Sequence, residues 1–358
     1  MYKLMTPGPS SVPDSVLAAR SEWFPNPDVD TSFCEEYHDI CLTIARLLHT
    51  GNEVLILDGE GILGLEAACA SLTEPGDRVL VLDNGIYGAG FADFVKMYGG
   101  TPVLYTCDYR NPIDAAALRD FLEKDHDFKY ASIVHCDTPS GMLNDVSAIC
   151  PLIKSYGILT LVDSVSAMFG AKLRVDDWNI DIACGGSQKA LSAPPGLSFL
   201  SVSDDAFAVM ENRRTPIASF YCNIMTFRNY YKDKWFPYTM PASDIYGLRE
   251  ALRIVEADTD RIARHERLAK QVRDTVTAAG LTLYPESGFS PTVTVINVPE
   301  GKNADDIISA IREKYGILVA GSFGFLAGKV LRIGHMGNSA NDADVEETLK
   351  AVIETMTK

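Results

Sequence analysis

The chain has 358 residues, of which 47% are hydrophobic and 22% are charged, the composition of a folded globular protein rather than of a disordered or collagen-like one. Its formal net charge is −16, and no run of basic residues supplies the electrostatic footprint of a nucleic-acid-binding protein. The cysteines form no CxxC metal or redox motif, no apolar stretch approaches the roughly 18 residues of a membrane span, and the N-terminus lacks a signal-peptide pattern. We therefore expect a cytoplasmic protein without a metal site and without nucleic-acid or membrane partners.

Short apolar runs alternate with amphipathic stretches over most of the chain. Seven runs predict strands: Glu53–Leu57, Arg78–Leu82, Val103–Tyr105, Ser132–His135, Leu159–Val162, Ile182–Ala183 and Leu197–Val202. Four stretches between them predict helices: Leu63–Leu72, Gly90–Tyr98, Ala115–Lys124 and Val146–Tyr156. Non-alternating apolar strands between helices indicate an α/β fold with a mostly parallel sheet that helices sandwich.

The pattern changes near Asp244. A single long helical region is predicted at Ile245–Ala279. It is followed by a strand at Thr292–Val298, a helix at Ala304–Lys314, a strand at Val330–Ile333 and a helix at Asp342–Met356. The first twenty residues contain three prolines and predict an irregular arm. We expect an N-terminal arm (1–20), a large domain (21–243) and a smaller C-terminal α+β domain (244–358) that begins with the long linking helix.

Three glycines, Gly59, Gly61 and Gly64, spell G-x-G-x-x-G between a predicted strand and a predicted helix. Asp83 follows at the distance of a ribose-binding acid, so the motif alone is compatible with an NAD-dependent dehydrogenase. A glycine turn before a helix also suits a single phosphate monoester, or it is a tight structural turn. The motif by itself leaves these three interpretations open.

Lys189 and Asp163 favour a different chemistry. Lys189 lies in a loop with few nearby charges, and a poorly solvated lysine loses its proton readily and can form a Schiff base, although a solvated surface lysine is the ordinary alternative. Asp163 ends an apolar run, where it would face the ligand crevice of a parallel sheet, unless it only caps a turn. Beside a pyridine ring such a carboxylate keeps the ring nitrogen protonated. With the glycine turn, these residues describe a pyridoxal-phosphate site.

Here the sequence resembles the class V (fold type I) pyridoxal-phosphate-dependent aminotransferases, in particular the alanine–glyoxylate / serine–pyruvate group. The resemblance extends from Thr6 to Gly334, and its strongest motifs are Gly-Ser-Gln-Lys-Ala-Leu (186–191) with Pro-Pro-Gly (194–196), Val-Asp-Ser-Val (162–165) and Lys-Val-Leu-Arg-Ile-Gly (329–334). It implies a seven-stranded large domain with a small C-terminal domain. It also implies pyridoxal 5'-phosphate as cofactor, and transamination between a small amino acid (alanine or serine) and a 2-oxo acid (glyoxylate or pyruvate).

The resemblance assigns roles to individual residues. Lys189 matches the lysine that holds the cofactor as a Schiff base and moves the substrate proton, Asp163 matches the partner of the pyridine nitrogen, and Val165 packs under the ring. The other positions implied to bind the cofactor are Gln188, Gly61, Ile62, Glu60, Tyr87, Thr138 and Thr239. Of these, Tyr87 would stack on the ring, unless it is an ordinary core tyrosine.

Two assignments reach beyond the cofactor. Thr239 matches a threonine that contacts the phosphate from the neighbouring subunit, which implies a homodimer with its active site at the interface. Arg332 stands in an apolar strand, and a buried guanidinium needs an anionic partner. The resemblance makes that partner the substrate carboxylate, and an internal aspartate or glutamate is the alternative.

Three departures from the family pattern concern the substrate and the phosphate. Glu60 stands in the phosphate turn where relatives have serine or threonine, Phe236 replaces a tyrosine, and the segment Phe24–Phe33 replaces one that contains histidine and arginine. Transamination of 2-aminoethylphosphonate with pyruvate or of ureidoglycine with glyoxylate therefore stays open. A dehydrogenase and a non-catalytic binding protein are the alternatives from other functional classes.

Overall fold

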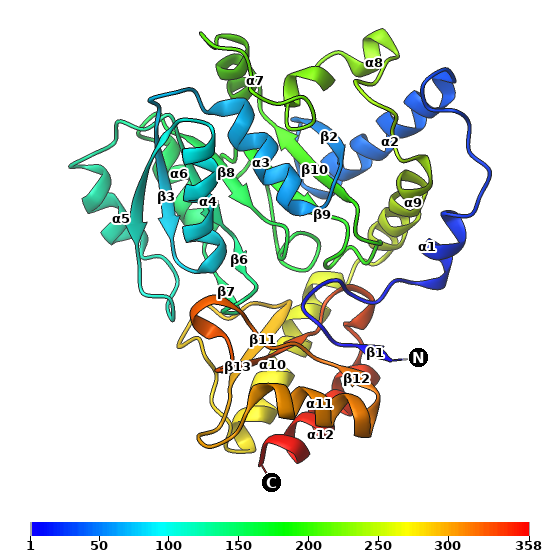
Figure 1. Cartoon of the computed structure of the whole chain (residues 1–358), viewed down its shortest axis with the longest axis vertical. Helices are drawn as coiled ribbons and strands as arrows, with labels where there is room; N and C mark the ends of the chain where they lie inside the picture. Colours follow the sequence, from blue (N-terminus) through cyan, green and yellow to red (C-terminus); the bar gives the residue numbers. More distant parts are fainter. Residues whose placement is uncertain (1, 358) are drawn as a thin grey trace.

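The computed structural model describes residues 2–357, and a seven-stranded sheet forms its centre (Figure 1). In the sheet order, the strands are β2 (Glu53–Asp58), β10 (Leu197–Val202), β9 (Ile182–Gly186), β8 (Leu159–Asp163), β5 (Tyr130–Val134), β3 (Arg78–Asp83) and β4 (Thr101–Thr106). Every pairing is parallel except the two made by β10, which runs antiparallel to β2 and to β9. The predicted mostly parallel sheet is therefore confirmed, and all seven apolar runs are its strands.

Helices cover both faces of this sheet because its strands are apolar on both sides. In the view of Figure 1, α3 (Gly61–Leu72) and α4 (Ile86–Met97) lie in front of the strands, whereas α5 (Ala115–Leu122) and α6 (Val146–Lys154) lie behind them. The first turns of α5 and α6 are capped by the carboxylates of Asp114 and Asp145, which accept backbone N–H groups. The outer side of the sheet next to β2 is completed by α2 (Thr31–Leu47), α7 (Asp204–Glu211) and α8 (Tyr230–Asp233).

The predicted single helix at Ile245–Ala279 is wrong, because the structure has two helices there. They are α9 (Ala242–Ala257) and α10 (Arg261–Ala278), separated where Asp258 leaves the helical backbone region and accepts hydrogen bonds from Arg264. The apolar side of α9 packs into the large hydrophobic cluster around the sheet, whereas α10 packs into a second cluster. A straight helix could not serve both cores, so the chain bends between them.

The second cluster belongs to the lower part of the molecule in Figure 1. Its framework consists of the antiparallel pair β11 (Val293–Asn297) and β13 (Val330–Gly334) with the helices α10, α11 (Ala304–Tyr315) and α12 (Asp342–Thr357). The predicted strands and helices of this region are confirmed within a few residues. No helix within residues 2–357 is long and apolar enough to cross a bilayer.

The prediction of a wholly irregular N-terminal arm is also wrong. Within it, β1 (Lys3–Leu4) pairs in parallel with β12 (Ile317–Leu318), and α1 (Asp14–Ala19) buries Val16 and Ala19 next to α9. Both elements are too short to show a periodic pattern, and they form because distant segments supply their partners. The residues between them run past β13 and past the loop after β9, where the backbone N–H of Ser10 donates to the Gln188 carbonyl.

Candidate active site

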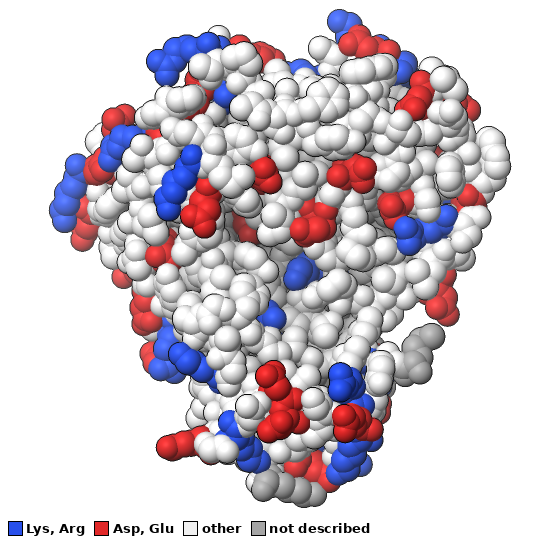
Figure 2. All heavy atoms as spheres, viewed as in Figure 1, with Lys and Arg blue, Asp and Glu red and all other residues white. Residues whose placement is uncertain are grey.

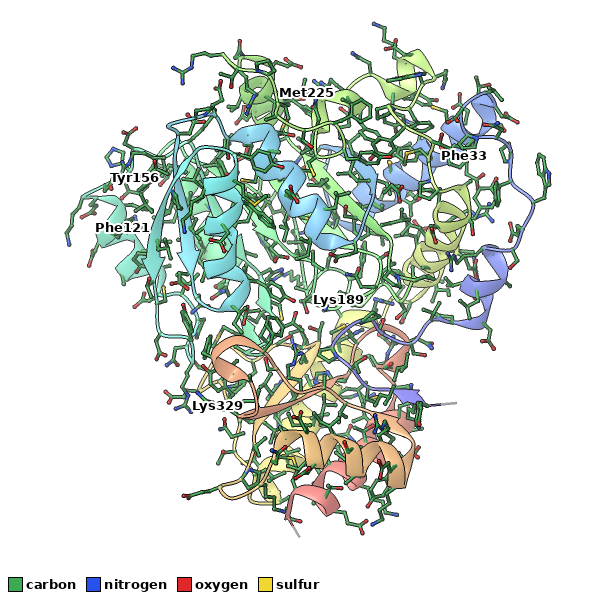
Figure 3. All side chains as sticks on the ribbon, in the orientation of Figure 1. Phe33, Phe121, Tyr156, Lys189, Met225 and Lys329 are labelled. Atoms are coloured by element: carbon green, nitrogen blue, oxygen red, sulfur yellow. The ribbon has the colours of Figure 1, made fainter. Side chains whose placement is uncertain are left out.

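A cavity lies where α3 begins, β8 ends and the chain leaves β9, between the sheet and the C-terminal part of the molecule. Its lining residues are Glu60, Gly61, Ile62, Leu65, Tyr87, Cys136, Thr138, Asp163, Val165, Ser166, Gln188 and Lys189. Figure 2 shows a hollow in the middle of this face with acidic groups above it, and Figure 3 places Lys189 at the same level between the two parts. Of the predicted site residues within the described chain, Arg332 and Thr239 are the two outside this lining.

Lys189 is held at the edge of the cavity by the N-terminal arm. Its ammonium group donates a hydrogen bond to the carbonyl oxygen of Pro7 over 2.7 Å. Gly8 has a φ of 95°, which favours glycine, and a Cβ atom there would come within 2.5 Å of the Lys189 Nζ. Burial lowers the pKa of Lys189 to about 8, and the charge of Arg332 acts in the same direction. Near neutral pH this amine is therefore more available as a nucleophile or base than an ordinary lysine.

Asp163 is the last residue of β8 and lies at the floor of the cavity. The backbone N–H of Val165 donates to its Oδ1 over 3.0 Å, which fixes the carboxyl group in the turn after the strand. Burial is the main cause that raises the pKa of Asp163 to about 6. Val165 also lies against α3, where a Cβ on Gly61 would approach its methyl carbon to 2.7 Å. A buried carboxylate in this position favours a cationic partner inside the cavity.

Tyr87 is positioned by a residue for which sequence analysis had assigned no role. The buried carboxylate of Asp137 accepts the Tyr87 backbone N–H over 3.1 Å and the Ser140 hydroxyl over 2.6 Å. Gly85 lies directly against it, with a φ of 155° and no room for a side chain. Burial raises the pKa of both Tyr87 and Asp137 above their ordinary values. An acid two residues after the predicted strand Ser132–His135, in Cys-Asp-Thr-Pro, was the available sequence signal.

The glycine turn before α3 contains a pair of polar side chains. Gln188 donates from Nε2 to Glu60 Oε2 over 3.0 Å, which joins the turn to the Lys189 loop. Glu60 precedes the first helical residue, but its side chain does not cap the helix. The Gln188 Oε1 is buried and has no hydrogen-bond partner among residues 2–357. The first N–H groups of a helix favour a negative group, and the Glu60 side chain leaves those of α3 without a side-chain cap.

Arg332 lies in β13 next to the cavity. Its Nε donates to the Gly321 carbonyl over 2.6 Å, and Nη1 makes a long contact of 3.5 Å to the Thr138 carbonyl. No acidic side chain of the described residues lies within the 4.0 Å of an ion pair, so the alternative of an internal acidic partner is not realised. Burial lowers the pKa of Arg332. This half-buried guanidinium keeps its capacity for an anion from outside the protein.

Several candidates from the sequence lie elsewhere. Thr239 donates its hydroxyl to Asp28 over 2.8 Å, and its role across a subunit interface stays a prediction. Asp83 accepts hydrogen bonds from the hydroxyls of Tyr109 and Thr106, so this carboxylate is engaged within the protein. Phe236 is buried against other aromatic rings, with its ring centroid 4.9 Å from that of Tyr37.

Two further groups at the cavity were missed in the sequence. The Ser166 hydroxyl is buried, lines the cavity and has no hydrogen-bond partner among the described residues. The Pro7 carbonyl accepts the hydrogen bond of Lys189, which is 182 positions away in the sequence. Ser166 follows the Val-Asp-Ser-Val motif directly, which was a usable signal. The Pro7 contact leaves no local trace in the sequence, because it depends on how the arm crosses the fold.

Comparison with known proteins identifies several aminotransferases that resemble this chain. The family "Aminotransferase class-V" matches residues 4–346. The chain is 37% identical to a pyridoxamine–pyruvate transaminase of Mesorhizobium japonicum, over 87% of this chain and 81% of that protein. It is 33% identical to an alanine–glyoxylate aminotransferase of Callithrix jacchus, over 99% and 87%. The crystal structure of a ureidoglycine–glyoxylate aminotransferase from Bacillus subtilis superimposes with a TM-score of 0.95 at 29% identity, covering 99% of this chain and 92% of that one.

Proposed function

The chain belongs to the class V aminotransferases, a pyridoxal-phosphate-dependent family, and we propose that Lys189, Asp163 and Arg332 carry its transfer of an amino group between an amino acid and a 2-oxo acid. Alanine or serine is the proposed donor, and glyoxylate or pyruvate is the proposed acceptor. The observation that carries the proposal is that a buried Lys189 amine and a buried Asp163 carboxylate line one cavity, and neither has an ion-pair partner among the described residues.

The ring end of the cavity fits the pyridoxal group. Asp163 can receive a protonated pyridine nitrogen, and such a partner would offset the burial that raises its pKa. Val165 and the unpartnered Ser166 hydroxyl lie on the same wall, next to the backbone of Gly61. When bound, pyridoxal phosphate supplies an aldehyde that condenses with amines and a ring that withdraws electrons from the adjacent carbon.

The side chains of this protein divide the remaining work. Arg332 binds the substrate carboxylate and so orients its Cα hydrogen toward Lys189. Lys189, with its lowered pKa, would remove that proton as the neutral amine and deliver it to the carbon that the aldehyde of the cofactor supplies, on the other side of the amino nitrogen. Asp163 keeps the proton on the ring nitrogen, and Tyr87 closes the side of the cavity opposite Val165.

An absorbance titration tests this function. Addition of pyridoxal phosphate to the purified protein should give a visible band that bleaches with alanine or serine and returns with pyruvate or glyoxylate. Ureidoglycine and 2-aminoethylphosphonate extend the donor panel. The Lys189→Ala variant is the control, and it should show no band shift on cofactor addition. A wild-type protein that gives no band at any cofactor concentration contradicts the proposal.

A second candidate function takes pyridoxamine itself as the amino donor and pyruvate as the acceptor, giving pyridoxal and alanine. Glu60 favours it, because a carboxylate hydrogen-bonded to Gln188 occupies the turn in which a phosphate dianion would lie. A carboxylate and a phosphate dianion in the same turn would repel each other. The neutral hydroxymethyl group of pyridoxamine can instead donate a hydrogen bond to this carboxylate. The name of the 37% identical relative supports this candidate.

Binding competition between pyridoxal and pyridoxal phosphate distinguishes the two candidate functions. A pyridoxamine–pyruvate enzyme forms alanine from pyridoxamine and pyruvate without added phosphate ester, and it binds pyridoxal more tightly than pyridoxal phosphate. The Glu60→Ser variant should then reverse that preference. An enzyme that uses pyridoxal phosphate as cofactor shows the opposite order in the wild type, and free pyridoxamine does not sustain turnover.

We also propose a homodimer in the cytoplasm. Its proposed domains are 1–20, 21–243 and 244–358, and α9 joins the last two while it packs on the large one. Large apolar side chains stand exposed in the segments that precede Asp28 and Thr239 in the sequence, namely Trp23 at 84% and Trp235 at 57% exposure. Such exposed aromatic residues are typical of a surface that a partner covers. The eight free thiols favour a reducing compartment. Light scattering on the purified protein measures the assembly, and a monomer that turns over fully contradicts the shared site.

A further inference from the structure

A short loop of the C-terminal part brings an aromatic ring to the carboxylate site. The loop joins β12 to β13, and Phe323 on it is 42% exposed. The Phe323 ring lies edge-on to Tyr87, with ring centroids 6.0 Å apart, and the Arg332 guanidinium lies 5.8 Å from its centroid. Phe323 therefore lies between Tyr87, which lines the cavity, and Arg332, the candidate carboxylate-binding residue.

The loop is held against the large sheet domain rather than standing free. The Ser322 hydroxyl donates to the Pro139 carbonyl over 3.3 Å, and the Phe325 ring packs on Tyr109 with centroids 5.2 Å apart. Gly324, with a φ of 59°, turns the chain between the two aromatic residues. These contacts hold the loop in place and keep the Phe323 ring beside Arg332, where it covers one side of the guanidinium.

The charges around this wall leave room for a single carboxylate. Among the described residues that lie at the cavity or influence its groups, the cations are Lys189 and Arg332, whereas Glu60, Asp137 and Asp163 are acidic. A guanidinium over an aromatic face is partly satisfied by the ring, and the ring covers that side from a second anion. A second carboxylate on the substrate would meet the negative face of Phe323 or one of the acids, without a cation to compensate its desolvation.

We propose that Phe323 is a specificity-determining residue, which restricts the Arg332 site to 2-oxo acids with one carboxylate and excludes their dicarboxylic counterparts. The proposal rests on the transamination proposed above and names its acceptor class. Pyruvate and oxaloacetate make the sharpest pair of probes, since they differ by one carboxylate group.

The test compares kcat/KM for pyruvate and for oxaloacetate at one fixed amino donor, with alanine and aspartate separated by chromatography as products. The wild type should favour pyruvate, and Phe323→Ala should shift the ratio toward oxaloacetate about tenfold, the size of a single pocket contact. Phe325→Ala is the matched control, because it removes an equally exposed ring, 41% against 42%, from the same loop on the Tyr109 side. Its ratio should equal that of the wild type.

A binding measurement keeps the proposal independent of turnover. By ligand-observed NMR, propionate should bind the wild type better than succinate, and Phe323→Ala should bring the two together. Phe323→Leu, which keeps an apolar side chain, serves if the alanine variant does not fold. Equal ratios in the Phe323 and Phe325 variants, or a wild type that accepts both classes alike, would overturn the proposal. A protein that transaminates no acceptor but still selects propionate contradicts the proposed function and leaves the role of Phe323 supported.

Discussion

The two ends of the cavity differ in how far the protein has satisfied its own polar groups. At the ring end, Asp163 and Lys189 are buried, and hydrogen bonds with backbone groups hold their side chains in place. Burial raises the pKa of Asp163 and lowers that of Lys189, so it favours the neutral form of each group. At the turn end, Glu60 and Gln188 hydrogen-bond to each other. The charged groups of the ring end have backbone hydrogen-bond partners but no ion-pair partner among the described residues, which suits a charged ligand. The Glu60–Gln188 hydrogen bond at the turn end can be changed by one substitution, so we propose that the ring end determines the reaction and the turn end determines which ring compound binds.

Removal of Lys189 should have the largest effect. Lys189→Ala eliminates both the covalent attachment and the proton-transfer base, and we expect kcat to fall by about 10³-fold or more. The free energy of unfolding should stay equal or rise, since a buried ammonium group disappears. Kinetics and thermal melts measure both. Lys96→Ala, which changes an exposed lysine outside the cavity, is the control. A variant that retains a tenth of the activity contradicts the role of Lys189.

The Asp163→Asn substitution should be next in size. Asparagine keeps an oxygen for the Val165 N–H but loses the charge that would hold the ring nitrogen protonated. We expect kcat to fall by about 10²-fold, with unchanged binding of the substrate carboxylate at Arg332. Rapid-mixing absorbance separates the ring step from substrate binding. If affinity for the 2-oxo acid falls as much as kcat, then Asp163 only supports the fold.

The strands and the ring end could be predicted because their signals are local. The run Leu159–Val162 is uniformly apolar, and Asp163 ends it, so the strand and its acid are read together. Lys189 stands out in an uncharged loop for the same reason. The bend at Asp258 escaped prediction because α9 and α10 are both rich in charge, and only the separation of the two cores requires it.

Contacts between loops could not be predicted in this way. Pro7 meets Lys189, and Phe323 meets Tyr87, through segments without periodic pattern whose approach depends on how the two parts of the molecule dock. Asp137 is intermediate, because its position after a strand was visible but its partners, Tyr87 and Ser140, were not. Site residues that act through the backbone of distant segments are therefore the ones that a single sequence hides.

The Glu60→Gln substitution tests the turn end with the same isosteric change that Asp163→Asn makes at the ring end. Glutamine can still accept the Gln188 hydrogen bond, but the repulsion of a phosphate dianion is removed. We expect affinity for pyridoxal phosphate to rise about tenfold, because the substitution removes one negative charge that would repel the phosphate in a partly solvated site. Affinity for pyridoxal should stay the same or fall. Equilibrium titrations of both compounds give the ratio. Equal changes for the two compounds would show that Glu60 does not face the phosphate position.

The smallest expected effect is a shift in the pH dependence of the reaction of Lys189 with an aldehyde. The size of this shift can be compared between a variant of the ring end and a variant of the turn end. Only the neutral Lys189 amine attacks an aldehyde, and burial lowers its pKa to about 8, so the rate of covalent capture of pyridoxal should rise with pH and level off above about 8. The negative charges of Asp163 and Glu60 both oppose this lowering, with Asp163 the stronger. Asp163→Asn should therefore move the midpoint to lower pH, and Glu60→Gln should move it in the same direction by less. Stopped-flow capture rates measure the midpoint. A larger shift in the Glu60 variant would show that Glu60 affects the Lys189 amine more strongly than Asp163 does. That result would contradict the proposed roles of the two ends of the cavity.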